Sequence, residues 1–151
     1  MNTAKENLHT DRVLILHTDG GARGNPGPAG IGAAFWERAT DGSTHSVHEI
    51  SRYIGEQTNN FAEYTALIAA VTWAKESGYG SVECYLDSEL VVKQLNGQYK
   101  IKEPTLKQLA AQVLAMTRSF KRITFTHVRR EKNKEADALV NRAVDAALAG
   151  R

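Results

Sequence analysis

The sequence predicts an α/β protein in which a mixed sheet carries helices on both faces. Three apolar segments early in the chain, at residues 13–18, 30–37 and 43–54, are typical of strands, and the connections between them are too short for a helix. Two later strand segments, at 81–87 and 122–128, alternate with helical segments instead. We therefore expect a five-stranded sheet, with three antiparallel strands followed by parallel strands.

The length and composition indicate one soluble domain. The chain has 151 residues, 42% of them hydrophobic, and this is enough to bury a core without disulfides. No run approaches the roughly 18 apolar residues of a membrane span, and the N-terminus lacks the apolar region of a secretory signal. The single cysteine, Cys84, fits a reducing compartment and is typical of a small core residue. We expect a cytoplasmic protein with no membrane contact, a polar tail over 1–12 and one domain over 13–151.

Apolar periodicity and turn residues define the first elements. The strand at 13–18 is VLILHT, and the glycines of the next stretch, DGGARGNPGPAG, are expected to end it. The segments 30–37 (GIGAAFWE) and 43–54 (STHSVHEISRYI) complete an antiparallel meander. The segment 60–75, NFAEYTALIAAVTWAK, is apolar almost all round, which is the pattern of a buried helix. Three residues are candidates for its N-cap: Thr58, Asn59 and Asn60.

The second half of the chain alternates helices with the remaining strands. The strand at 81–87 (SVECYLD) precedes Ser88, a good N-cap for the helix SELVVKQL. Pro104 begins a further helix, and RITFTHV at 122–128 is the last strand. Asn133 opens the closing helix. The apolar stripe of that helix consists of Ala136, Leu139, Val140, Ala143, Val144 and Ala147.

Charge is distributed unevenly along the chain, although the net charge is only +2. Residues 88–134 carry 11 basic and 3 acidic side chains, whereas residues 1–87 carry 6 basic and 11 acidic ones. A basic segment next to an acidic one favours a polyanionic partner that is held by one part of the surface while carboxylates act elsewhere.

Four carboxylates stand where the predicted elements can bring them together. Asp19 and Asp87 follow strands that become parallel neighbours if a helix connects them, so both would emerge at the same edge of the sheet. Glu63 lies in the first turns of the buried helix, where a charge needs a partner. Asp137 lies one turn after the start of the last helix, beside the apolar stripe. We expect these side chains to converge on one spot.

Convergence of carboxylates favours a divalent metal site. Two carboxylates about 4 Å apart repel by roughly 4 kcal/mol at an effective dielectric constant of about 20. Divalent cations relieve this repulsion, and hard oxygen ligands without a cysteine or histidine pattern favour Mg²⁺ or Mn²⁺ over zinc. Two such ions about 3.5–4 Å apart would suit phosphodiester hydrolysis.

Four blocks of the sequence, in their order and at their spacing, resemble the type 1 ribonuclease H family: TDGGARGNPGPAGIG, TNNFAEYTAL, YLDSELVVKQL and HVRREKNKEADALVNRA. The resemblance covers about residues 13–148. It implies a ribonuclease H-like fold with the first strand central, and endonucleolytic hydrolysis of the RNA strand of an RNA/DNA hybrid that leaves 3′-hydroxyl and 5′-phosphate ends. The family's catalytic carboxylates, which hold two Mg²⁺ ions with Mn²⁺ as a substitute, fall on Asp19, Glu63, Asp87 and Asp137.

The same resemblance implies roles for particular residues. Asp19 would bridge both ions, and Glu63 would also sense the ribose 2′-hydroxyl group of the RNA strand. Glycines after Asp19 would let the backbone approach the nucleic acid closely. The positions that match or neighbour family contacts to the hybrid are Gly20, Gly21, Asn25, Thr58, Asn59, Asn60, Ser88 and Arg130. A plain turn and ordinary helix caps are the alternative interpretation of most of these residues.

The chain departs from many family members in two places. It lacks the loop histidine that precedes the last aspartate, because only RREKNKEA separates the last strand from Asp137. His127 is expected to project from the strand, so Arg130 is the nearest replacement, as in short-loop members of archaeal type. The basic helix and loop that some members use to hold the hybrid is also missing, and only NGQYKIKEPT lies between Leu95 and Leu106.

Three functions remain open from the sequence. The first is a hybrid-specific metal nuclease that acts as a monomer. The second is a noncatalytic nucleic-acid-binding module of the same fold, in which the carboxylates would usually be lost. The third is a related nuclease that acts on DNA or double-stranded RNA.

Overall fold

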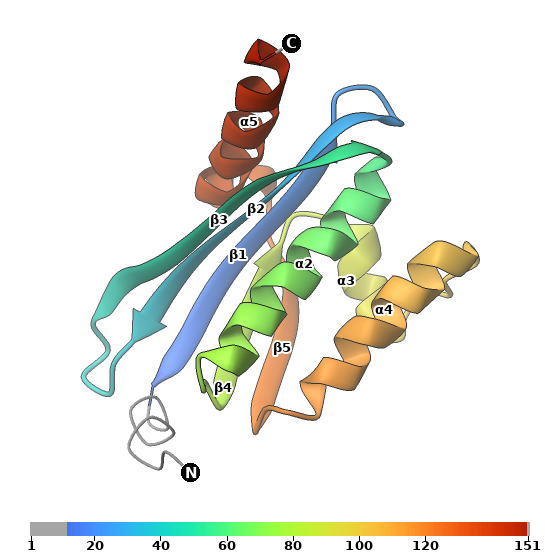
Figure 1. The fold of residues 1–151 in the computed structure, drawn as a ribbon. Helices are drawn as coiled ribbons and strands as arrows, with labels where there is room; N and C mark the ends of the chain where they lie inside the picture. Colours follow the sequence, from blue (N-terminus) through green and yellow to red (C-terminus); the bar gives the residue numbers. More distant parts are fainter. Residues whose placement is uncertain (1–11, 151) are drawn as a thin grey trace.

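The computed structural model describes residues 12–150 and places β1 (Val13–Ala22) at the centre of a five-stranded mixed sheet (Figure 1). The strand order is β3-β2-β1-β4-β5. β2 (Gly27–Arg38) pairs antiparallel with β1 and with β3 (Thr44–Gln57). β4 (Ser81–Leu86) pairs parallel with β1 and with β5 (Arg122–His127). The fold class predicted from the sequence, an antiparallel meander followed by parallel strands, is confirmed.

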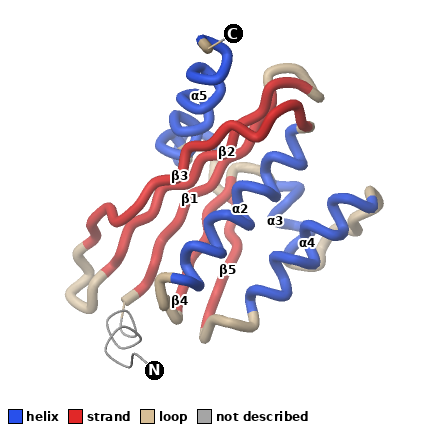
Figure 2. The backbone as a smooth tube through the Cα atoms, in the orientation of Figure 1, coloured by secondary structure: helices blue, strands red, loops and turns tan. Residues whose placement is uncertain are grey.

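Helices cover both faces of this sheet (Figures 1 and 2). α2 (Asn59–Glu76) and α4 (Pro104–Thr117) lie on one face, where the short helix α3 (Glu89–Leu95) joins them. α5 (Lys134–Ala149) lies on the other face, against β2, β3 and β1, and follows the 3₁₀ turn η1 (Arg130–Lys132). None of the described helices is long and apolar enough to cross a membrane.

The main core lies between the sheet and α2. Leu14 and Leu16 of β1, Phe35 of β2 and Leu67 of α2 are fully buried there. Each such side chain contributes roughly 1.5–3 kcal/mol by its removal from water. Cys84 is also fully buried, and burial raises the pKa of its thiol, in agreement with a packing role.

The first three strands are longer than the sequence predicts. β1 does not end at Thr18 but continues to Ala22, and β2 begins at Gly27 rather than at residue 30. The glycines after Asp19 pair across the hairpin, with Asp19 opposite Gly32 and Gly21 opposite Gly30. Glycines are poor strand formers on their own, but here the ladder to β2 keeps them extended. β3 likewise continues to Gln57, three residues beyond its predicted end.

The helix starts show which candidate caps are used. Thr58 caps α2, because its hydroxyl group accepts a hydrogen bond from the Phe61 amide at 3.2 Å. Ser88 caps α3 in the same way, as predicted. Asn133 stands at the N-cap position of α5 but makes no capping bond with its side chain. The tail predicted over 1–12 lies, except for Arg12, outside the described residues.

Candidate active site

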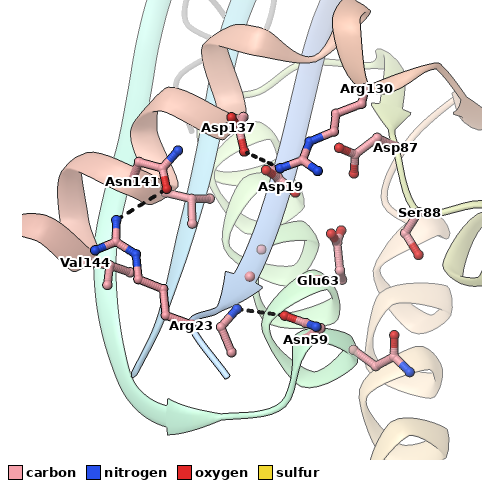
Figure 3. A pocket seen from close by; sticks show the side chains of 15 residues that line it. Asp19, Arg23, Asn59, Glu63, Asp87, Ser88, Arg130, Asp137, Asn141 and Val144 are labelled. Carbon is pink, nitrogen blue, oxygen red and sulfur yellow. Dashed lines mark hydrogen bonds and ion pairs between the residues drawn. The ribbon is translucent and has the colours of Figure 1, made fainter. Parts of the chain in front are cut away.

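An open cleft of about 600 Å³ lies at the edge of the sheet where β1 and β4 leave their parallel pairing (Figure 3). That pairing ends at Thr18 and Leu86, so Asp19 and Asp87 are the next residues on neighbouring strands. The residues that line the cleft are Asp19, Gly20, Gly21, Ala22, Arg23, Asn59, Asn60, Glu63, Asp87, Ser88, Arg130, Asp137, Val140, Asn141 and Val144.

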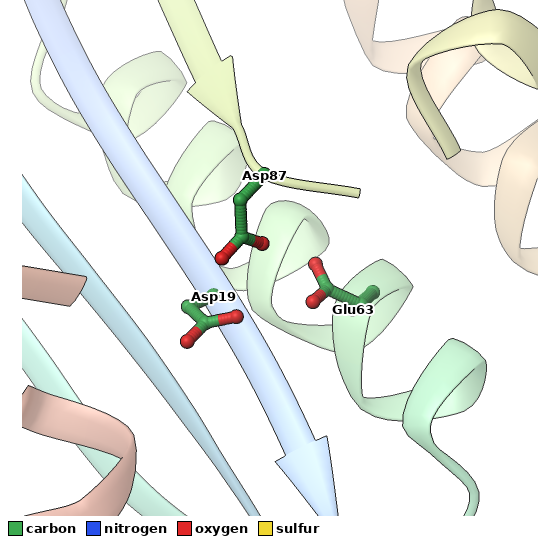
Figure 4. Close-up of side chains that lie close together, drawn as sticks. All are labelled: Asp19, Glu63 and Asp87. Atoms are coloured by element: carbon green, nitrogen blue, oxygen red, sulfur yellow. The ribbon is translucent and has the colours of Figure 1, made fainter. Parts of the chain in front are cut away.

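Three carboxylates meet on the floor of this cleft. Asp19 comes from β1, Asp87 follows β4, and Glu63 reaches in from the second turn of α2 (Figure 4). One carboxylate oxygen of each residue lies within 4.8 Å of the others. Asp19 and Glu63 are each only 7% exposed, so water screens their mutual repulsion poorly.

The pKa values reflect this crowding. Burial and the charge of Asp87 raise the pKa of Asp19 to about 7. Burial and the charges of Asp19 and Asp87 raise the pKa of Glu63 well above its usual value. Burial also raises the pKa of Asp87, although the Arg130 guanidinium group opposes this rise. The cluster therefore cannot hold all its negative charges at neutral pH without a compensating cation.

The donor set fits a divalent cation with hard oxygen ligands. The Glu63 Oε2 atom is buried and accepts no hydrogen bond from the described residues. A buried carboxylate oxygen of this kind needs a partner, and a metal ion supplies one. Oxygen ligands alone, without sulfur or imidazole in the cluster, suit Mg²⁺ or Mn²⁺.

Asp137 lies at the border of this group. Its side chain is 34% exposed, and it is not among the three carboxylates that lie within 4.8 Å of one another. Its charge nevertheless contributes to the raised pKa of Asp19. Arg130 Nη2 lies 3.8 Å from Asp137 Oδ1, so a largely exposed cation faces the fourth carboxylate across the mouth of the cleft (Figure 3).

The relatives of this chain identify its family. Residues 17–143 match a family model described as reverse transcriptase-like. A protein named Ribonuclease HI from Halobacterium salinarum is 42% identical over 140 residues, which cover 91% of this chain and 68% of that protein. The chain belongs to the type 1 ribonuclease H family.

Solved ribonuclease H structures agree with the fold. LC11-RNase H1 in complex with an RNA/DNA hybrid is 48% identical, with a TM-score of 0.81 over 89% of this chain and 99% of that one. The RNase H1 of Halobacterium salinarum is 40% identical, with a TM-score of 0.80 over 89% and 98% of the two chains. Among sequence relatives, the Bifunctional protein Rv2228c of Mycobacterium tuberculosis is 44% identical over 134 residues. This chain spans only 36% of that relative's length.

The residues that the ribonuclease H resemblance predicts to contact substrate lie in two places. Gly20, Gly21, Asn59, Asn60, Ser88 and Arg130 line the cleft itself. Asn25 and Thr58 do not, and instead line an adjoining hollow of about 570 Å³ that also contains Asn60, Glu103 and Thr105.

Two of the predicted contact residues, Asn25 and Asn59, also hold the β1–β2 hairpin in place. Asn25 Oδ1 accepts a hydrogen bond from the Asn59 amide at 3.0 Å, and Asn59 Oδ1 accepts one from the Ala22 amide at 2.8 Å. These bonds fasten the turn between β1 and β2 to the start of α2. Both asparagines therefore have a structural role, whether or not they contact nucleic acid.

Two polar residues of the cleft wall, Arg23 and Asn141, were not predicted from the sequence. Arg23 Nη2 donates to Asn141 Oδ1 at 3.4 Å (Figure 3). It also lies 2.6 Å from Asp145 Oδ1. A signal for Asn141 was present, because it lies four residues after Asp137 and hence on the same face of α5. Arg23 had no comparable signal beyond its place in the glycine-rich stretch.

The raised pKa of Asp19 predicts that stability falls with rising pH in the absence of divalent ions. Between its ordinary pKa of 3.8 and about 7, the folded protein holds a proton that the unfolded chain has released, so the free energy of unfolding decreases as pH rises through this range. At about pH 8 in EDTA, we expect the free energy of unfolding of Asp19→Asn to exceed that of the unsubstituted protein by roughly 1–3 kcal/mol. Asp19→Asn should then unfold at a higher urea concentration.

Urea denaturation at about pH 5 and about pH 8 checks this expectation. The difference between Asp19→Asn and the unsubstituted protein should be small at the lower pH and should disappear with excess Mg²⁺ at the higher one. A difference in the free energy of unfolding that does not change with pH or Mg²⁺ would show that burial and the neighbouring carboxylates do not destabilise ionised Asp19.

Proposed function

We propose that this chain is an endoribonuclease that hydrolyses the RNA strand of RNA/DNA hybrids with two divalent ions, Mg²⁺ or Mn²⁺, and leaves 3′-hydroxyl and 5′-phosphate ends. The observation that carries the proposal is the group of three crowded carboxylates, Asp19, Glu63 and Asp87, in the cleft at the carboxyl end of β1 and β4. The fold is shared at 48% identity with LC11-RNase H1, whose structure includes an RNA/DNA hybrid. The proposal treats the protein as a monomer in the cytoplasm.

The carboxylates have different places in this proposal. Asp19, Glu63 and Asp87 would hold one ion, because an oxygen atom of each points into a common space. Asp19 and Asp137 would hold the second ion, because Asp19 also experiences the charge of Asp137. When bound, such ions supply a water acidified for attack on phosphorus and stabilise the charge on the leaving oxygen.

The rest of the cleft would bind and orient the hybrid. Gly21 has no side chain, and its Cβ position is open apart from Val140 Cγ1 at 4.0 Å, so a sugar-phosphate backbone could approach β1 closely there. Glu63 would accept a hydrogen bond from the ribose 2′-hydroxyl group, which only the RNA strand provides. Arg130, which is 81% exposed at the mouth of the cleft, would contribute positive charge near the scissile phosphate.

Cleavage of matched duplexes tests the function. End-labelled RNA paired with DNA is compared with RNA/RNA and DNA/DNA duplexes in Mg²⁺, in Mn²⁺ and in EDTA. We expect metal-dependent cutting of the RNA in the hybrid alone. Cutting of RNA/RNA or DNA/DNA would show a nuclease that is not specific for hybrids. Binding of the hybrid without any cutting would favour a noncatalytic binding module.

The basic segment predicts a steep salt dependence of hybrid binding. Lys100 and Lys102 are exposed in the connection that leads to α4, whose first turn borders the hollow beside the cleft. Replacing both lysines and Arg130 by alanine should reduce the slope of log affinity against log salt by about 2–3, because each lost phosphate contact removes about 0.9.

A matched triple substitution controls for net charge. Arg118, Lys121 and Arg122 belong to the same basic segment but lie at the end of α4 and the start of β5, at the opposite edge of the sheet from the cleft. Their replacement by alanine should leave the slope nearly unchanged. Equal effects of the two triple substitutions would mean that general charge, and not the surface beside the cleft, determines binding.

A further inference from the structure

A buried residue outside the carboxylate cluster is bonded to the segments that carry three of the four carboxylates. Asn133, just before α5, is fully buried. Its Nδ2 atom donates to the carbonyl oxygen of Thr18, the residue before Asp19, at 2.8 Å. The main-chain carbonyl oxygen of Asn133 accepts a hydrogen bond from the Asp137 amide at 3.1 Å, as the first helical bond of α5. A hydrogen bond from the Asn133 side chain also lowers the pKa of Asp87, although burial raises that pKa more.

His17 fixes the orientation of this amide. The Asn133 NH₂ group donates to the Thr18 carbonyl oxygen, so the Asn133 Oδ1 atom is the acceptor that lies 3.0 Å from His17 Nδ1. Nδ1 of His17 must therefore carry the proton of this bond. The imidazole ring cannot turn away easily, because it stacks on Tyr85 with ring centroids 5.1 Å apart and meets the edge of Trp36 at 5.5 Å.

We propose that Asn133, oriented by the His17 N–H group, is a positioning residue that sets the relative places of Asp19, Asp87 and Asp137 for metal binding. The inference rests on the metal site of the proposed function and names a part of that site. Without the His17 bond, the Asn133 amide loses its fixed orientation. The Asn133 side chain then no longer holds the ends of β1 and β4 to the start of α5. Neither His17 nor Asn133 lines the cleft, so neither needs to touch substrate.

The chain offers a matched pair of substitutions at residue 17. His17→Phe keeps a ring that can stack on Tyr85 but removes the donor. His17→Asn removes the ring but places an amide nitrogen where Nδ1 stands, because both nitrogens are bonded to Cγ. Binding is measured by calorimetric titration of each folded protein with Mg²⁺ alone, without nucleic acid, and circular dichroism and Tm report the fold.

We expect His17→Phe to weaken Mg²⁺ binding about tenfold, as loss of a partner behind metal ligands commonly does, and His17→Asn to bind within about threefold of the unsubstituted protein. A purely structural role would lower the Tm of His17→Phe and leave its Mg²⁺ affinity unchanged, which would overturn the proposal. Equal losses in both variants would also overturn it, because the ring and not the donor would then matter.

Two further measurements keep the test decisive. If His17→Phe does not fold, Asn133→Ala replaces it, and Mg²⁺ affinity equal to that of the unsubstituted protein would overturn the proposal. The titrations do not depend on nuclease activity. If the unsubstituted protein binds Mg²⁺ but cuts no duplex, the proposed function fails while the positioning role is still decided by the affinities.

Discussion

Asp19→Asn is expected to reduce cleavage of the RNA strand of a hybrid by about a thousandfold or more. Asp19 is the carboxylate that experiences the charges of Asp87 and Asp137 and the hydrogen bond to Glu63, so in the proposed two-ion mechanism no neighbour can take its place. Asparagine has nearly the same shape but only one neutral oxygen ligand. Single-turnover rates in saturating Mg²⁺ measure the loss, and hybrid binding should persist because a negative charge has been removed near the phosphates.

Asp137→Asn is the matched comparison. Asp137 is partly exposed and lies outside the group of three close carboxylates, so we expect its replacement to reduce the rate by about tenfold to a hundredfold, clearly less than Asp19→Asn. If the Asp19 variant kept more than a tenth of the activity, or if Asp137→Asn reduced the rate more, the proposal that Asp19 binds both ions would be wrong.

The second large effect concerns stability. Gly20 lies directly under the start of α2, and a Cβ atom added there would stand 2.2 Å from the carbonyl carbon and oxygen of Ala62. Neither backbone can give way without moving α2, so we expect Gly20→Ala to lower the free energy of unfolding by about 3 kcal/mol or more. Because Glu63 follows Ala62, the same displacement should also abolish metal binding.

Gly21→Ala provides the control one residue further along the strand. A Cβ atom at Gly21 meets nothing closer than Val140 Cγ1, at 4.0 Å. Its replacement should change the free energy of unfolding by less than about 1 kcal/mol. Urea denaturation of both variants measures the difference, and similar stabilities would mean that α2 does not approach β1 as closely as the structure indicates.

Sequence reasoning reached the fold because the decisive signals are local. The short connections required an antiparallel meander, and the all-apolar pattern of 60–75 required a buried helix. The end of β1 and the start of β2 could not be predicted in this way, because Gly20 and Gly21 stay extended through pairing with Ile31 and Gly30. Local propensity gives way to cross-strand hydrogen bonds at such positions.

The site was predictable to a similar extent. Strand ends and helix starts indicated where the carboxylates stand, and four family blocks agreed with them. The relative positions of the four carboxylates were not predictable: Asp19, Glu63 and Asp87 lie close together, whereas Asp137 lies at the rim of the cleft. The contacts of Asn133 were also hidden, since its partners His17 and Thr18 lie 116 and 115 residues away in the chain.

The central place of β1 has a consequence for amide hydrogen exchange. β1 is paired on both sides up to Thr18, and Asp19 continues the strand through its pairing with Gly32, so we expect this segment to open at a free energy close to that of global unfolding. Asp137 lies in the first turn of α5, whose start is held to β1 by the buried Asn133 but whose next residues, Lys134 and Glu135, are exposed, so we expect its segment to open at a lower free energy. Native-state exchange should therefore be slow around Asp19 and faster around Asp137, and the Asp137 side of the proposed metal site could then adjust to ion and substrate without loss of the fold.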